Sequence, residues 1–167
     1  MNLFHYVLDP KLLRNLPRYV LQCSLATLVL LGVLLARDAL ASAVVVAAIG
    51  STAFVLFIMP HSEMAQPRHV LGGHGVALAT GAACAFVDPS VAWQFALGGS
   101  VAVGAAMFLM AATNTEHAPA AGSALGIVAA GVSWDLVLLL VLSIVSLAAI
   151  HGVLLPWLDD LYQPRHH

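Results

Sequence analysis

The chain alternates between long apolar stretches and short polar segments. A membrane-spanning helix requires about 20 predominantly apolar residues. Six apolar stretches approach or reach that length, and each ends at a proline, a charged residue or a polar cluster. The pattern therefore predicts six helical segments, at residues 19–36, 39–59, 70–87, 92–112, 119–132 and 136–155.

Two of these segments, 70–87 and 119–132, are short for a full crossing, and each follows a polar motif that contains proline. If both cross, the protein has six spans, and if both are re-entrant or broken helices, it has four. Irregular backbone at membrane depth is tolerated only where it is buried in protein or lines a cavity. The order of long helix, polar motif and short helix occurs twice, at 39–87 and 92–132, as in an internal repeat. Chance similarity between Ala-rich spans explains that order equally well.

Composition supports a membrane protein. Of the 167 residues, 61% are hydrophobic and 8% are charged, against roughly 25% charged in a soluble domain. We therefore expect an all-α membrane protein, a polytopic bundle of about six helical segments at residues 19–155. An interfacial segment at 1–18 and a tail at 156–167 would flank it. The net charge of −2 leaves no basic surface for nucleic acid, and the two cysteines form no CxxC pair.

The basic residues predict an orientation. With six crossings, Arg37 lies on one side of the membrane, and the other five basic residues share the opposite side: Lys11, Arg14, Arg18, Arg68 and Arg165. Cytoplasmic loops carry the excess of Lys and Arg. We therefore expect a multi-pass protein of the inner (plasma) membrane with both termini in the cytoplasm.

A polar motif at residues 60–74 contains the first candidate site. Arginine presents a planar fork of donors that suits a small planar oxyanion, and histidine donates a hydrogen bond when neutral. Two adjacent glycines allow close backbone approach at the start of the next helix. The candidate binding residues in this motif are His61, Gln66, Arg68, His69, Gly73 and His74. Alternatively, Arg68 is a topology residue that pairs with Glu63.

A second motif, at residues 113–122, precedes the other short segment. Pro119 suits the first turn of a helix, and Thr115 is placed to cap that helix, leaving amides that attract an anion. From spacing alone, an ordinary loop and cap is the better-supported interpretation. Ionisable groups at membrane depth are costly without partners, so we predict that the two motifs meet and that His74 lies near His117.

Two further patterns bear on packing and on metal binding. Small residues recur at helical spacing, which predicts close helix packing. The three stripes are Ala39, Ala43, Ala47 and Ser51; Ala77, Gly81 and Ala85; and Ala118, Gly122, Gly126 and Ala130. Four histidines could instead bind a metal or haem in a redox or enzyme subunit, although no HxxxH spacing supports this: His61, His69, His74 and His117.

These motifs resemble the HPP family of integral membrane proteins. The resemblance is carried by Ala65-Gln66-Pro67-Arg68, Gly73-His74 and, farther on, Thr115-x-His117-x-Pro119-Ala120-x-Gly122. It spans roughly residues 19–155, with His117-Ala118-Pro119 where the family carries His-Pro-Pro. Because some plant-plastid and cyanobacterial members are regarded as nitrite transporters, the resemblance implies transport of a small anion.

We therefore expect a non-enzymatic transporter or channel for a small inorganic anion, most plausibly nitrite, without a cofactor and assembled as a homo-oligomer in the lipid bilayer. Arg68 would hold the anion, and His74 and His117 would donate hydrogen bonds to it. Gln66 and Thr115 would complete the polar lining. The metal- or haem-binding subunit is the alternative function.

Overall fold

The computed structural model describes residues 12–35 and 43–161. Within these ranges the chain forms six α-helices and no strand. The helices are α2 (Leu12–Leu35), α3 (Ala43–Ile58), α4 (Pro67–Cys84), α5 (Ala92–Thr113), α6 (Ala118–Ala130) and α7 (Trp134–Leu154). Two short 3₁₀ turns, η2 (Glu63–Ala65) and η3 (Leu155–Trp157), precede α4 and follow α7. The fold is all-α, as the sequence predicts.

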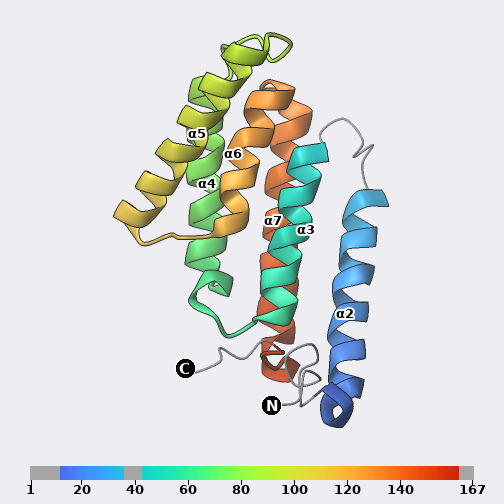
Figure 1. Cartoon of the computed structure of the whole chain (residues 1–167). Coiled ribbons are helices and arrows are strands. Elements are labelled where there is room, and N and C mark those ends of the chain that lie inside the picture. Colours follow the sequence, from blue (N-terminus) through green and yellow to red (C-terminus); the bar gives the residue numbers. More distant parts are fainter. Residues whose placement is uncertain (1–11, 36–42, 162–167) are drawn as a thin grey trace, which may run out of the picture.

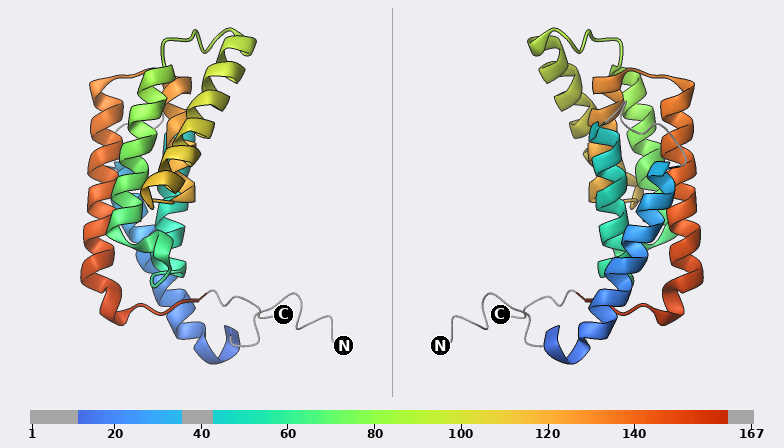
Figure 2. Two further views of the ribbon diagram at one scale, coloured as in Figure 1. Left: turned by 90° about the vertical axis from the view of Figure 1, so that its left-hand side faces the viewer. Right: turned by 90° about the vertical axis from the view of Figure 1, so that its right-hand side faces the viewer.

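Consecutive helices run in opposite directions (Figure 1). Helix α6 is the central element, because it packs against α3, α4 and α5, while α7 packs against α3 and α4. Helix α2 contacts α3 and otherwise stands at the edge of the bundle, and α5 is inclined along the other side (Figure 2). We call the end with the start of α2, the α3–α4 connection and the end of α7 the Arg68 end, and the other the Asp88 end.

The observed helices match the six predicted segments closely. The first one differs, because α2 begins at Leu12 and continues through Pro17 into the apolar stretch. The sequence predicted a separate interfacial segment at residues 1–18. Residues 12–18 are instead the first part of α2, and residues 1–11 lie outside the described ranges. Helix α4 has 18 residues and α6 has 13. At 1.5 Å per residue, α6 is about 20 Å long, shorter than the hydrocarbon core.

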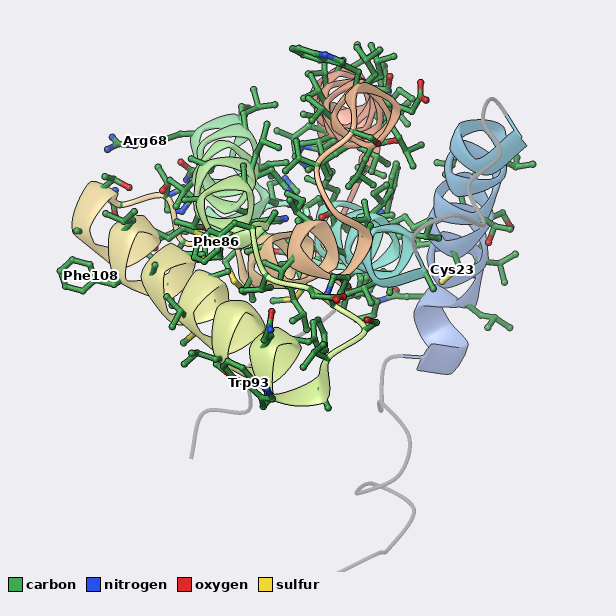
Figure 3. All side chains as sticks on the ribbon, turned by 90° about the horizontal axis from the view of Figure 1, so that it is seen from above. Cys23, Arg68, Phe86, Trp93 and Phe108 are labelled. Carbon is green, nitrogen blue, oxygen red and sulfur yellow. The ribbon has the colours of Figure 1, made fainter. Side chains whose placement is uncertain are left out.

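The outer surface of the bundle is apolar. Helix α5 and the segment Trp134–Trp157 are each long and apolar enough to cross a membrane, and α3 and α6 are shorter apolar helices. Trp93 and Phe108 point away from the bundle on the outer face of α5 (Figure 3). Large aromatic side chains are stable in such positions when the surrounding solvent is lipid. Such a surface is typical of an integral membrane protein.

Small residues let α6 approach its neighbours. A Cβ added at Gly126 would lie 2.6 Å from Cγ2 of Val45 and 3.0 Å from its backbone nitrogen, and one added at Gly81 would lie 2.9 Å from the Ala124 carbonyl oxygen. Two of the predicted stripes thus contribute to close packing. The stripe on α3 does not, because Ala43, Ala47 and Ser51 are exposed within the chain; the buried face of α3 carries Val45, Ala48, Ile49 and Thr52.

Polar contacts close the Arg68 end. The side chain of Gln22 is 2% exposed, and its Nε2 donates to the carbonyls of Phe57 and Asp159, each at 2.8 Å. Arg18 forms an ion pair with Asp159 at 2.6 Å. His151, on α7, donates from Nε2 to the Pro60 carbonyl at 3.1 Å. These bonds tie α2, α7 and the C-terminal segment to the end of α3.

The packing of α6 predicts a difference between two glycines. Gly126→Ala should lower the thermal stability of the detergent-solubilised protein, because Val45 and its backbone must move, which typically costs about 1–3 kcal/mol. Gly122→Ala is the matched control, since a Cβ there meets Ala48 at an ordinary 3.5 Å. An unchanged melting temperature for Gly126→Ala would contradict the observed approach of α6 to α3.

The arrangement also predicts which loops can be labelled from which side. With five basic residues at the Arg68 end or in flanking segments, that end should face the cytoplasm. In a background lacking Cys23 and Cys84, Asp160→Cys should react with an impermeant maleimide only after the cell is opened. Ser90→Cys, at the Asp88 end, should react in intact cells. Labelling of Asp160→Cys in intact cells, with Ser90→Cys labelled only in opened cells, would show the opposite orientation.

Candidate functional site

The junction between α5 and α6 lies partway along the bundle instead of at its end (Figure 1). Helix α5 ends at Thr113, and its C-cap Asn114 has a φ of 53°, a left-handed conformation that Asn tolerates. The amide of Thr115 then donates to the Met110 carbonyl at 3.0 Å. The chain is extended at His117, the N-cap of α6. Irregular backbone is thus brought against the side of the bundle, where Thr115 and His117 are buried and Asn114 and Glu116 stay exposed.

Two glycines of α4 provide the surface on which this junction packs. A Cβ at Gly72 would lie 2.7 Å from Cγ2 of Thr115, and one at Gly73 would lie 2.8 Å from Cβ of His117 and 3.0 Å from the Thr115 carbonyl oxygen. Any side chain at these two positions would displace the junction from α4. Gly73 therefore sets the position of His117, whether or not it contacts a ligand.

The two motifs meet in a buried polar cluster, which comprises Thr52, His74, His117 and Ser123. The imidazole centroids of His74 and His117 lie 5.2 Å apart, so the predicted proximity of these residues is confirmed. The hydroxyl oxygen of Thr52 lies between them, 3.0 Å from Nε2 of His74 and 3.2 Å from Nε2 of His117. The two rings are 4% and 0% exposed.

Each end of the polar cluster has a further partner. Nδ1 of His74 is 3.0 Å from Oγ of Ser123, on α6. Nδ1 of His117 is 2.8 Å from the carbonyl oxygen of Met64, in η2. The cluster thus joins α3, α4, α6 and the α3–α4 connection. Every side-chain nitrogen in it has a hydrogen-bond partner, as expected for polar groups buried away from water.

Two members of the polar cluster were not among the sequence-predicted site residues. Thr52 and Ser123 are single hydroxyl residues within apolar segments, and both are fully buried. Thr52 falls on the helical face that includes Val45, Ala48 and Ile49, one turn from each of the last two. A hydroxyl on the most apolar face of a membrane helix is the signal that could have indicated it.

His69 and Thr115 are buried next to the polar cluster. Nδ1 of His69 is 3.1 Å from the backbone oxygen of Glu116 and 3.7 Å from its carboxylate. The prediction that Thr115 caps α6 is wrong, since His117 is the N-cap and the Thr115 hydroxyl bonds that of Thr113 at 2.9 Å. Pro119 is buried in the first turn of α6, as predicted.

The other predicted residues lie at the surface of the Arg68 end. Nη2 of Arg68 donates to the Thr113 carbonyl at 2.9 Å, and Figure 3 shows its side chain extending outward from α4. This contact, rather than a pair with Glu63, is the one formed by Arg68 among the described residues. Gln66 is the exposed N-cap of α4, and exposed His61 lies near Asp160. The structure therefore brings His74 and His117 together without Arg68, Gln66 or His61.

The chain was also compared with protein-family models, curated proteins and solved structures. Residues 13–160 match the family model described as HPP, transmembrane region. The chain belongs to the HPP transmembrane family. No curated protein and no solved structure matches it. The match covers α3 to α7 in full and α2 from its second residue onward, so the polar cluster lies inside the HPP transmembrane region.

The remaining candidates for ligand binding in this HPP domain are weaker. A groove of about 100 Å³ between α4 and α7 includes His74, but its other lining residues are apolar or glycine, such as Leu71, Leu140 and Ile144. Such a lining does not suit an anion. Among the described residues, no three His, Cys, Asp or Glu side chains gather as metal ligands would. The metal-site alternative therefore has no ligand set in this part of the chain.

The shared hydroxyl predicts coupling between the two histidines. His74→Ala and His117→Ala should each lower thermal stability, and the double variant should depart from additivity by about 0.5–3 kcal/mol, because both rings depend on Thr52. The pair His74→Ala and His151→Ala is the control. His151 bonds Pro60 and shares no hydrogen-bond partner with His74, so these effects should add. Additive effects of His74→Ala and His117→Ala on stability would contradict the shared hydrogen bonds to Thr52.

Proposed function

We propose that this HPP-family membrane protein transports a small inorganic anion and that nitrite is its substrate. The observation that carries the proposal is the polar cluster of Thr52, His74, His117 and Ser123 inside an apolar membrane bundle. Polar and ionisable groups at such depth are costly and are typical of transport pathways. Its location at an irregular junction between two helices inside the bundle is also typical of transporters.

The chemistry of the polar cluster favours an anion over a cation. Its side chains offer hydroxyl and imidazole donors, and no carboxylate of the described residues forms an ion pair with His74 or His117. A cation site would require carboxylate or several carbonyl oxygens. In this conformation the donors bond one another, so an anion would enter by replacing those bonds. A planar oxyanion such as nitrite is small enough to receive two or three donors at once.

Arg68 suits the entrance to this pathway. Its contact with Thr113 leaves the guanidinium exposed at the Arg68 end, where it can attract an anion from solution. Ser62, in the same connection, has a buried hydroxyl oxygen with no hydrogen-bond partner among the described residues. An unsatisfied buried hydroxyl is a donor available to a ligand. We place the protein in the plasma membrane with the Arg68 end toward the cytoplasm, and assembly into a homo-oligomer stays a prediction.

Flux measurements test the proposal. Purified protein in proteoliposomes should take up nitrite faster than protein-free vesicles, and faster than it takes up chloride; nitrate and formate would define the selectivity. Arg68→Lys should weaken nitrite affinity a few-fold, because an ammonium keeps the charge but not the planar fork that can hold the Thr113 carbonyl and an anion together, and an exposed charge contact contributes up to about 1 kcal/mol.

Arg18→Lys is the matched control for that variant, since Arg18 lies at the same end but pairs with Asp159. It should transport like the unmodified protein. Nitrite flux equal to that of empty vesicles would overturn the proposal. Equal flux in both lysine variants would reduce Arg68 to a residue that sets topology and holds the end of α5.

A further inference from the structure

The hydrogen bonds of the polar cluster have a single consistent direction. A carbonyl oxygen only accepts, so Nδ1 of His117 must carry a proton and donate it to the Met64 carbonyl. In the neutral ring, Nε2 of His117 carries only a lone pair, so this hydrogen bond forms when the Thr52 hydroxyl donates to it instead of to the Ala48 carbonyl. The Thr52 oxygen in turn accepts from Nε2–H of His74, and Nδ1 of His74 accepts from Ser123. With the Thr52 hydroxyl donating to His117, the Met64 carbonyl therefore determines the position of every proton in the cluster.

Thr52 also has a second acceptor. Its hydroxyl oxygen lies 3.0 Å from the carbonyl oxygen of Ala48, one turn earlier in α3. If a proton joins Nε2 of His117, the Thr52 hydrogen can turn to Ala48. The two lone pairs of the hydroxyl oxygen then accept from His74 and His117 together. The cluster can therefore gain one proton with every hydrogen bond kept and no heavy atom displaced.

A second added proton would not be accommodated in this way. It would join Nδ1 of His74, opposite a Ser123 hydroxyl for which the structure gives no other partner. It would also place two positive rings with centroids 5.2 Å apart at a buried site, where like charges repel strongly. The geometry therefore sets the capacity of the cluster at one additional proton.

The surrounding charges do not neutralise that proton. Helices α3, α5 and α6 contain no Asp, Glu, Lys, Arg or His. The ionisable groups of α7, Asp135 and His151, lie near its two ends. The nearest groups are His69 on α4 and Glu116 at the junction. The Glu116 carboxylate is half exposed and lies 3.7 Å from Nδ1 of His69.

Farther out, Arg68 and Glu63 are exposed at the Arg68 end. Among the described residues, no carboxylate contacts His74 or His117, so a protonated cluster is a buried cation without a carboxylate in contact with it. A bound anion would supply the negative charge. By linkage, binding of the proton would then raise the affinity for the anion, and binding of the anion would raise the affinity for the proton.

On the basis of the proposed function, we propose that the polar cluster is a proton-binding site and that His117 takes up one proton with each anion. The Thr52 hydroxyl acts as the switch between the neutral and protonated states. A proton and a monovalent anion together carry no net charge, so the loaded site avoids the cost of moving an isolated charge through an apolar bundle. The transport cycle is then proton–anion symport.

Vesicle experiments measure the coupling. Proteoliposomes loaded with a pH-sensitive dye should acidify as nitrite enters, with one proton per nitrite after the leak of nitrous acid through protein-free vesicles is subtracted. An inside-alkaline gradient of one pH unit should drive roughly tenfold nitrite accumulation. Nitrite flux that neither acidifies the lumen nor responds to the gradient would overturn the symport and leave the proposed function standing.

Variants at Thr52 identify the switch. Thr52→Val removes the hydroxyl at nearly constant volume and should abolish gradient-driven accumulation, whereas Thr52→Ser should keep it. Thr80→Val is the matched control, because Thr80 is also buried but its hydroxyl bonds carbonyls of its own helix, Val76 and Ala77. Accumulation by Thr52→Val equal to that of Thr80→Val would exclude the Thr52 switch.

A direct measurement of protonation does not depend on transport. In ¹⁵N-histidine NMR spectra of the protein in bilayers, assigned with His74→Gln and His117→Gln, we expect the Nδ1–H tautomer of His117 and the Nε2–H tautomer of His74 at alkaline pH. On acidification, His117 alone should become doubly protonated. If both rings stay neutral on acidification of the folded protein, or if both become charged, the proton site is refuted, whether or not the protein transports nitrite.

Discussion

The approach of the α5–α6 junction to Gly72 and Gly73 is the contact on which the rest of the site depends. Without side chains at these positions, the backbone of Thr115 and the Cβ of His117 lie directly against α4. This contact places an extended segment against α4 and brings the imidazole centroids of His117 and His74 to 5.2 Å. A methyl group at either glycine would move the junction outward and separate the two rings. The glycines therefore determine the geometry of the site through packing rather than through chemistry of their own.

The Met64 carbonyl supplies the second constraint. It is part of the connection between α3 and α4, and it accepts from Nδ1 of His117. Buried polar groups stabilise a bundle only when they are all satisfied, and a partly satisfied network is costly. Because the carbonyl can only accept, it determines, once the Thr52 hydroxyl donates to His117, which atom donates in each hydrogen bond from His117 through Thr52 and His74 to Ser123. His151 of α7 bonds the Pro60 carbonyl of the same connection. The contacts that close the Arg68 end therefore also hold the segment that carries the Met64 carbonyl.

The periphery of the molecule is built differently from its centre. Helix α2 contacts mainly α3, and its main polar attachment is Gln22, which donates to carbonyls of Phe57 and Asp159. Its outward residues, like those of α5, are apolar and exposed (Figure 3). In lipid, such faces have no tendency to associate by the hydrophobic effect, and close packing of small residues takes its place. That packing is concentrated around α6, where the polar cluster lies.

The sequence determined most of the helical architecture. Blocks of apolar residues bounded by Pro60, Asp88 and Asn114 are sufficient to locate helices in a membrane protein, because every backbone polar group there must bond within its own helix. The meeting of His74 and His117 also followed from the sequence, since isolated imidazoles at that depth would lack partners. The motifs resembling the HPP family reinforced both conclusions.

The tertiary structure decided which polar groups share a site. Arg68 was grouped with His74 because they are close in sequence, but they lie on different faces of α4, and Arg68 turns outward to Thr113. Thr52 and Ser123 are hydroxyls in apolar spans, and no local pattern shows that they converge on the same imidazole. Their convergence depends on how α3 and α6 rotate about their axes as they pack. That rotation is fixed by contacts such as Gly126 against Val45, which join residues far apart in the chain.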